Sequence, residues 1–284
     1  MWIHKTDFRP IAKMASAGRR TLSAVGFYPE RAFGALRGGP FFVRSLKDFK
    51  QMIAHDDFGF PLTGLYPCLN DRNQQSGQAN GHYFHQDLLV ARKIYEANPT
   101  HHVDVGSRLD GFIAHVASFR EIEVFDIREE PPTVPHVSFR RMDFMSESLR
   151  LSEYCDSISS LHAIEHFGLG RYGDPIRPDG HLVGLTNIHR ALTPGGKFYL
   201  SVPIGPQRVE FNAHRVFALR YLSDLLSENY EIDSFAYVDD RGTLHENADL
   251  CSPAALQNFS CYFGCGIFEL TKRPSSMNAA DPVR

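Results

Sequence analysis

The sequence predicts one α/β domain built on a mostly parallel sheet, and three observations support this. Short apolar segments of strand length alternate with helical segments from Tyr83 onward. The first such strand, residues 102–105, stops at Gly106 directly before the next helix. Polar residues recur at the ends of the strands, where an open parallel sheet binds its ligands. Because helices that alternate with parallel strands cover both faces of the sheet, we expect three layers.

The segments follow one another in a regular order after residue 81. The expected strands are 102–105, 121–126, 137–142, 155–161, 197–202, 231–238 and 259–270, and the expected helices are 83–97, 112–119, 145–151, 182–192 and 215–228. In the first helix, the spacing of Phe84, Leu88, Ala91 and Tyr95 predicts one buried face. The last two strands can lie antiparallel.

Three regions are expected along the chain. Residues 1–81 are rich in Gly, Pro and aromatic residues and predict an irregular segment that covers the domain, with one helix from Ser45 to about His55. The α/β domain is expected over residues 82–272. Residues 273–284 are expected to form a flexible tail.

Composition excludes several classes of protein. The 284 residues are 43% hydrophobic and 22% charged, as in an ordinary globular chain, which argues against wholesale disorder. The formal net charge of −3 lacks the excess of positive charge that is typical of general nucleic-acid binders, so we expect no nucleic-acid partner.

Apolar runs and cysteines indicate a cytoplasmic location. The longest apolar runs, such as 88–91 and 198–202, are far shorter than the ~18 to 20 residues of a membrane span. Charges interrupt residues 1–20, so we expect no signal peptide there. Five cysteines favour reduced thiols. Cys261 and Cys265 lack a second pair, so we interpret them as buried thiols and expect no metal.

Two acidic residues predict a nucleotide-like ligand. Asp104 lies in the first strand, and Asp126 ends the second strand 22 residues later. This is the usual spacing of an acidic residue that binds a ribose. A dinucleotide turn would need a glycine at Arg108, and Asp110 would repel a phosphate. A rim formed by Asp104, Asp110, Asp126 and Asp143 favours the cationic cofactor S-adenosyl-L-methionine instead.

Several motifs together resemble the Rossmann-like S-adenosylmethionine-dependent methyltransferases. The resemblance covers residues 82–272 and is carried by residues 103–111, Asp126, Asp143 with Phe144, 156–167 and 192–203. Within that superfamily, residues 161–175 and 81–87 look like those of an uncharacterised family with a domain of unknown function. The resemblance implies a seven-stranded sheet with an antiparallel last strand. It departs from the superfamily pattern at Arg108 and Asp110, where glycines are usual.

The resemblance also implies roles at the cofactor. Asp126 would accept the ribose hydroxyls, and Asp143 with Phe144 would contact adenine. Gly106 would pass the backbone under the cofactor. The turn and the methionine end would be lined by Asp104, Ser107, Arg108, Ser160, Leu161 and His162.

A methyl acceptor with a hydroxyl group would need a nearby base. His166 and Glu165 follow the fourth strand, and His214 follows the fifth. His166 is the first choice as catalytic base, although Glu165 and His166 could also simply pair with each other. We expect a small-molecule or sugar acceptor, contacted from the loop 168–180 by Arg171, Tyr172, Asp174 and Arg177. The group His82, Tyr83, His85, Gln86 and Asp87 either closes the pocket or forms a solvated helix face.

Three alternatives compete with the methyltransferase hypothesis. Residues 162–166 match the HxxEH pattern of a zinc protease, but Gly168, Gly170 and Gly173 disfavour the long helix that this pattern needs. The altered glycine turn would suit a binding or scaffold protein that has lost turnover. Asp126 alone would also permit a nicotinamide-dependent oxidoreductase.

Overall fold

The structure, a computed structural model, describes residues 29–54, 59–73, 76–77, 79–129 and 133–274. The chain divides into two compact units between Gln78 and Ala79. The predicted covering role of the first unit stays a prediction. The predictions for residues 1–28 and for the end of the tail lie outside the described residues.

The first unit contains a long helix that the sequence did not predict in full. Helix α2 (Pro29–Ile53) begins 16 residues before the predicted start at Ser45 and is followed by the short 3-10 helix η1 (Asp71–Asn73). The run Gly38–Gly39–Pro40 predicted irregular chain but lies inside α2. A Cβ at Gly38 would lie 1.9 Å from the carbonyl oxygen of Leu69, so this glycine allows a close approach of two segments.

The second unit contains a mixed, mostly parallel sheet, as predicted. Its order is β3-β2-β1-β4-β5-β10-β8-β9. The first five strands in this order are parallel, and β10 lies antiparallel between β5 and β8. The strands are β1 (His102–Val105), β2 (Ile122–Asp126), β3 (Val137–Arg141), β4 (Cys155–Leu161), β5 (Leu192–Ile204), β8 (Tyr230–Val238), β9 (Leu244–His245) and β10 (Gly264–Lys272). Seven core strands and the short edge strand β9 confirm the predicted fold class.

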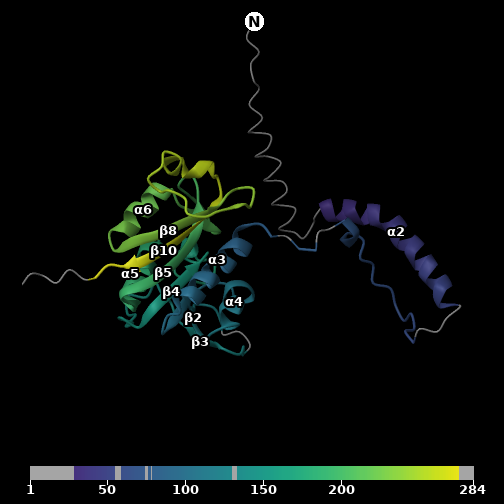
Figure 1. Cartoon of the computed structure of the whole chain (residues 1–284), viewed down its shortest axis with the longest axis horizontal. Coiled ribbons are helices and arrows are strands. Elements are labelled where there is room, and N and C mark those ends of the chain that lie inside the picture. The colour runs from purple at the N-terminus through teal and green to yellow at the C-terminus, as the bar shows by residue number, and fades with distance from the viewer. Residues whose placement is uncertain (1–28, 55–58, 74–75, 78, 130–132, 275–284) are drawn as a thin grey trace, which may run out of the picture. The chain divides into compact units, whose positions relative to one another are not determined.

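Helices cover both faces of the sheet (Figure 1). One face packs against α3 (His82–Ala97), the π-helical turn η2 (Leu109–Ile113) and α4 (Ala114–Ala117). The other face packs against α5 (Gly180–Ala191) and α6 (Leu219–Ser227). Of the predicted face of α3, only Ala91 is buried, because Leu89, Val90 and Ile94 enter the core while Phe84, Leu88 and Tyr95 are exposed. None of the helices that the structure describes is long and apolar enough to cross a membrane.

Two predicted helices differ from the observed elements. Residues 145–151 form turns, because Asp143 Oδ1 accepts a hydrogen bond from the Met145 amide and Ser146 Oγ accepts one from the Ser148 amide. Such local bonds compete with a helix. The helix predicted over 215–228 begins only at Leu219, and Arg215 lies in β7 (His214–Val216), which pairs with β6 (Arg208–Glu210).

The strand order reverses at β1. The chain passes outward from β1 to β2 and β3, then returns to the other side of β1 as β4 and continues to β5. In an open parallel sheet, such a reversal opens a crevice at the carboxyl ends of the two central strands. In this chain those ends are followed by Gly106 and His162.

A buried hydrogen-bond network joins β1 to β4 below this crevice. Asp104 is fully buried and accepts hydrogen bonds from the Ser107 amide at 2.9 Å, from Ser107 Oγ at 2.6 Å and from Ser159 Oγ at 2.5 Å. Burial raises the pKa of Asp104 to about 7, and the bonds from Ser107 and Ser159 offset this only in part. Folding therefore favours the protonated carboxyl group.

Replacement of Asp104 by Asn should change the pH dependence of stability. Because the folded pKa lies above the unfolded value of about 3.9, the wild-type free energy of unfolding should fall as pH rises from about 4 to 8. In Asp104→Asn, the free energy of unfolding measured with urea should fall less over this pH range, by on the order of 1 to 4 kcal/mol. In the control Asp110→Asn, which changes an exposed residue, the free energy of unfolding should fall with pH as in the wild type. An equal fall in Asp104→Asn would show that Asp104 is already ionised in the folded protein.

Candidate functional site

A cavity of about 270 Å³ opens at the carboxyl edge of the sheet, where the strand order reverses. Its wall contains Gly106 after β1, Asp126 at the end of β2, Asp143 after β3 and His162 after β4. Four segments that are far apart in sequence therefore meet at one place, as expected for parallel strands whose ends share an edge.

The predicted cofactor residues divide into two groups. Those that line the cavity are Gly106, Arg108, Asp126, Asp143, Phe144 and His162. Those that lie behind its wall are Asp104, Ser107, Ser160 and Leu161.

The second group holds the wall in place. Ser107 Oγ donates to Asp104 and accepts a hydrogen bond from the Leu161 amide at 3.0 Å. Ser160 Oγ donates to the Val105 carbonyl at 2.9 Å. The Leu161 side chain packs in the core against α3 and α4. These polar groups use their hydrogen bonds to join β1 to β4, so we assign them a supporting role rather than ligand contact.

Gly106 lets the backbone turn closely under the cavity. Its φ of +77° lies in the left-handed region, and its amide donates to the Phe125 carbonyl at 2.9 Å. A Cβ at this position would lie 3.0 Å from the Cβ of Ala163. A side chain here would be strained and crowded, which explains the glycine.

Asp126 is already partnered by an arginine that the sequence analysis did not identify. Both carboxylate oxygens accept hydrogen bonds from the Arg128 guanidinium, and Oδ1 also accepts one from the Arg128 amide at 2.8 Å. The guanidinium carbon lies 5.1 Å from the ring centre of Tyr172. The sequence Asp126-Ile127-Arg128 could have indicated this ion pair, because the side chains of Asp126 and Arg128 both lie at the end of β2.

The predicted acidic rim is only partly formed. Asp126 and Asp143 line the cavity, but Asp104 is buried behind the cavity wall. Asp110 is exposed and forms a bidentate pair with Arg108, with 2.8 Å and 3.0 Å bonds. The cavity wall therefore carries arginines beside its carboxylates, and its charge alone does not select a cationic ligand.

Asp143 and Phe144 form the floor after β3. The Phe144 ring is buried and packs 5.5 Å from the ring of Phe125. Asn187 of α5 fixes the Phe144 carbonyl through a 2.7 Å hydrogen bond. The cavity therefore has an apolar surface beside a carboxylate at this point.

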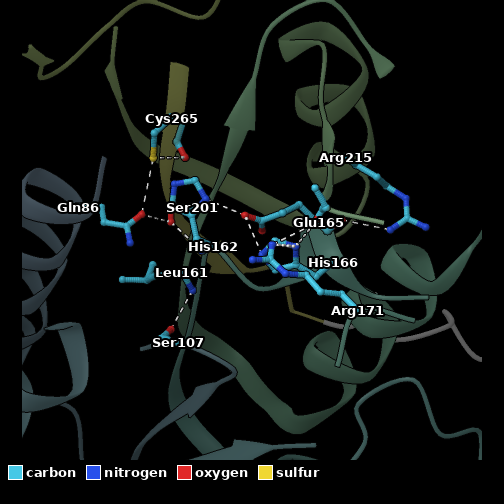
Figure 2. Close-up of polar contacts among 12 residues, drawn as sticks. Gln86, Ser107, Leu161, His162, Glu165, His166, Arg171, Ser201, Arg215 and Cys265 are labelled. Atoms are coloured by element: carbon cyan, nitrogen blue, oxygen red, sulfur yellow. Dashed lines mark hydrogen bonds and ion pairs between the residues drawn. The ribbon is translucent and has the colours of Figure 1, made fainter. Parts of the chain in front are cut away.

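Glu165 carries a buried charge between two histidines (Figure 2). Its side chain is 1% exposed, and Oε1 lies 2.6 Å from Nδ1 of His162 and 3.7 Å from Nε2 of His166. Burial opposes the charge on Glu165, but the charge and the hydrogen bond of His162 outweigh it and lower the Glu165 pKa. Burial also opposes the charge on His162, yet the Cys265 sulfur and Glu165 raise the His162 pKa well above its ordinary value.

His166 is held as a neutral imidazole facing the cavity. Burial lowers its pKa, more than Glu165 raises it. Nδ1 lies 2.6 Å from the Ala213 carbonyl oxygen, which can only accept, so Nδ1 carries the proton and Nε2 keeps its lone pair. Because His166 lines the cavity, this tautomer can act as a base there.

The other two predicted catalytic residues lie outside the cavity wall. Glu165 acts on the two histidines rather than on the cavity itself. His214 is partly buried in β7, with its ring 4.8 Å from that of Phe263 and Nε2 3.7 Å from Glu210. Burial lowers the pKa of His214. The structure therefore brings His166 and Glu165 together, whereas His214 contacts Phe263 and Glu210.

The loop after β4 supplies three of the four residues expected there. Arg171, Tyr172 and Asp174 line the cavity, while Arg177 pairs outside it with Glu147 and Asp179. Asp174 Oδ2 accepts hydrogen bonds from the Gly168 and Gly170 amides at 2.9 Å and 3.1 Å and so fixes the loop.

Helix α3 contributes one residue to the wall. Tyr83 lines the cavity, and the Arg108 guanidinium lies 4.9 Å from its ring centre. The neighbours His82, His85, Gln86 and Asp87 do not line it. Gln86 and Asp87 are buried and His82 and His85 are partly buried, so these four residues form neither the cavity wall nor a solvated helix face.

A model of one protein family matches part of the chain. The model of a family described as "Caenorhabditis protein of unknown function, DUF268" matches residues 118–252, which confirms the expected likeness to an uncharacterised family. No curated protein matches the chain.

Solved structures of methyltransferases are similar at low identity. One is a 1,6-didemethyltoxoflavin-N1-methyltransferase from Burkholderia thailandensis with bound S-adenosylhomocysteine, with 16% identity, coverage of 87% of this chain and 91% of that chain, and a TM-score of 0.47. Another is the N-methyltransferase NodS from Bradyrhizobium japonicum, with 11% identity, coverage of 75% and 95%, and a TM-score of 0.45. A putative methyltransferase from Bacillus halodurans has 15% identity, coverage of 65% and 99%, and a TM-score of 0.45. We transfer no residue role from them.

Replacement of Glu165 by Gln should lower the pKa of His162. The carboxylate is one of the groups that keep this buried imidazole charged, and an amide removes that charge while preserving the side-chain volume. NMR titration of the imidazole nitrogens should place the His162 pKa at least about one unit below that of the wild type, which corresponds to roughly 1.4 kcal/mol. The buried His102, at the amino end of β1, should titrate unchanged. An unchanged His162 pKa would show that Glu165 is protonated.

Proposed function

We propose that this protein transfers a methyl group from S-adenosyl-L-methionine to a hydroxyl oxygen of a small-molecule or glycan-type acceptor. The observation that carries the proposal is the position of the cavity at the reversal of strand order, with the Gly106 turn on one side and Asp126 on the other. The methyltransferase-like sheet order is consistent with this use of the cavity. When bound, the cofactor would supply an electrophilic methyl group on a sulfonium.

The chain offers a place for each part of the cofactor. Asp126 would accept hydrogen bonds from the ribose hydroxyls. A carboxylate has about four lone-pair sites, so Asp126 can accept these bonds while it keeps part of its pairing with Arg128. Asp143 and Phe144 would contact the adenine ring, and His162 would lie near the methionine end.

Methyl transfer is an in-line displacement, for which a protein chiefly aligns the reactants and excludes water. His166 Nε2 would accept the proton of the acceptor hydroxyl. The bond from Nδ1 to the Ala213 carbonyl keeps the tautomer that this requires. Arg171 and Tyr172 would bind polar groups of the acceptor from the loop after β4.

Ligand-binding measurements distinguish the proposed methyltransferase from a nicotinamide-dependent oxidoreductase and from a scaffold protein. A nicotinamide cofactor would place its pyrophosphate at the turn after β1, where Arg108 replaces the glycine that permits close approach. A scaffold protein would bind the cofactor without turnover, or bind none. Calorimetry with S-adenosylmethionine, S-adenosylhomocysteine and reduced nicotinamide cofactors distinguishes these cases.

Replacement of Asp126 by Ala should weaken binding of S-adenosylhomocysteine by more than about tenfold, because the ribose hydroxyls lose a charged acceptor. Asp224→Ala is the matched control, since Asp224 is an exposed acidic residue of α6 that lies outside the cavity wall. Isothermal titration calorimetry measures both. Equal affinity of Asp126→Ala and the wild type would place the ribose elsewhere.

Replacement of His166 by Ala should lower kcat by about 100-fold or more while the affinity for the cofactor changes less than about threefold. The reason is that His166 would act on the acceptor proton and not on the cofactor. Transfer of radiolabelled methyl groups to a panel of hydroxyl-bearing acceptors measures the rate. The exposed His136→Ala should leave it unchanged, whereas full activity in His166→Ala would assign the base to another group.

A further inference from the structure

Three side chains of metal-ligand type meet beside the cavity. His82 begins α3, His162 follows β4, and Cys265 lies near the start of β10. One ligand atom from each lies within 4.8 Å of the other two. β10 is antiparallel to β5, so its first residues reach the carboxyl edge of the sheet where β4 ends.

His162 has one ring nitrogen available to a ligand. Nδ1 is fixed by the 2.6 Å contact with Glu165, whereas Nε2 is buried, has no nitrogen or oxygen partner at hydrogen-bond distance within the described residues, and interacts only with the Cys265 sulfur. The side chain is 95% buried, since only 5% of it is exposed. Figure 2 shows the ring between Glu165 and Cys265. A buried polar atom without a nitrogen or oxygen partner is costly, and an unplaced ion is one explanation for it.

His82 is placed in a similar way. Its ring lies parallel to that of His162, with ring centres 5.3 Å apart and an interplanar angle of 3°. Its ring also stacks on that of Phe263, with ring centres 5.5 Å apart. Burial and the neighbouring His162 lower the pKa of His82 to about 4, so His82 is a neutral imidazole.

Cys265 supplies the sulfur. It is fully buried, and its Sγ lies 3.6 Å from Oε1 of Gln86, which also accepts a 2.5 Å hydrogen bond from Ser201. Gln86 comes one helical turn after His82. The amide oxygen thus lies beside the three ligand-type atoms and is itself able to bind a cation.

We propose that His82, His162 and Cys265 bind a divalent transition-metal ion of the zinc class. Two imidazoles and one thiolate form a ligand set that suits zinc and excludes magnesium and calcium, which prefer oxygen. Metal-binding histidines commonly donate their second nitrogen to a carboxylate or a backbone carbonyl. Glu165 occupies that position for His162 here.

Binding requires small movements and a loss of protons. Zinc lies about 2.0 to 2.1 Å from nitrogen and about 2.3 Å from sulfur, so the three atoms would have to move closer together. The Cys265 thiol proton, and a proton carried by His162 Nε2, would pass to solvent as the two metal bonds form. A fourth position remains for Gln86 Oε1 or a water molecule.

This site differs from the HxxEH zinc pattern considered from the sequence. His166 belongs to that pattern, but its Nδ1 faces the Ala213 carbonyl, and residues 164–166 form only a single 3-10 turn, η3. His162 instead joins residues from α3 and β10. This metal site is independent of the proposed methyl transfer, because its three ligands and their contacts do not involve the cofactor.

Cobalt(II) tests the site, because a thiolate bound to it gives an intense near-ultraviolet charge-transfer band. The full-length protein is stripped with a chelator and titrated with Co²⁺. Wild type and Cys261→Ser should develop the band at one equivalent, and Cys265→Ser should not. Cys261 is the matched control, since it is also buried, lies four residues earlier and is outside the cluster. Zn²⁺ should abolish the band, and Mg²⁺ should not.

The outcomes that overturn the proposal are equally defined. Absence of the band from folded wild-type protein, or a band of wild-type intensity in Cys265→Ser, excludes this site. His82→Ala provides a second variant should Cys265→Ser fail to fold, and its Co²⁺ affinity should fall at least about tenfold. An unchanged affinity would remove His82 from the site and contradict the proposal. Calorimetry with S-adenosylhomocysteine on the chelated protein tests the proposed function separately.

Discussion

The buried charge of Glu165 is the constraint on which the arrangement of this site depends. A carboxylate with 1% exposure is stable only if it is paired, and removal of a partner from a buried pair typically costs about 3 to 5 kcal/mol. Glu165 Oε1 faces both His162 and His166. It therefore fixes the orientation of His162, whose second nitrogen then points away from Glu165, and it places a negative charge beside the catalytic candidate. One carboxylate orients groups in the cavity wall and in the histidine-cysteine cluster.

The turn that carries Glu165 is held from the hairpin formed by β6 and β7. Arg215 is buried, and its guanidinium donates hydrogen bonds to the carbonyl groups of Glu165, Phe167, Arg177 and Pro178. Burial lowers the Arg215 pKa, yet four carbonyl acceptors compensate for much of the lost hydration. This side chain joins the two ends of the loop that supplies Arg171, Tyr172 and Asp174. The position of His166 is thus fixed by a residue that lies almost 50 positions later in the chain.

The sequence predicted those features that depend on local pattern. The short apolar strand ending at Gly106 and the acidic end of β2 placed the crevice correctly, because parallel strands end at a common edge. Asp104 was misjudged since a single sequence does not reveal that Ser159, on the neighbouring strand, donates to it. The cluster of His82 and Cys265 could not be predicted either. Their proximity depends on the pairing of β10 with β5, a long-range contact without a local signal.

Three charged residues of the cavity wall already have partners within the protein. Asp126 is bound by Arg128, Arg108 by Asp110, and Asp174 by backbone amides of its own loop. A charged acceptor would have to displace one of these partners and leave it unpaired in a partly buried site, which is costly. A neutral hydroxyl group needs only an acceptor for its proton, and His166 Nε2 offers a lone pair that none of these ion pairs uses. Under the proposed function, these three pairings would be kept intact by an alcohol or sugar acceptor.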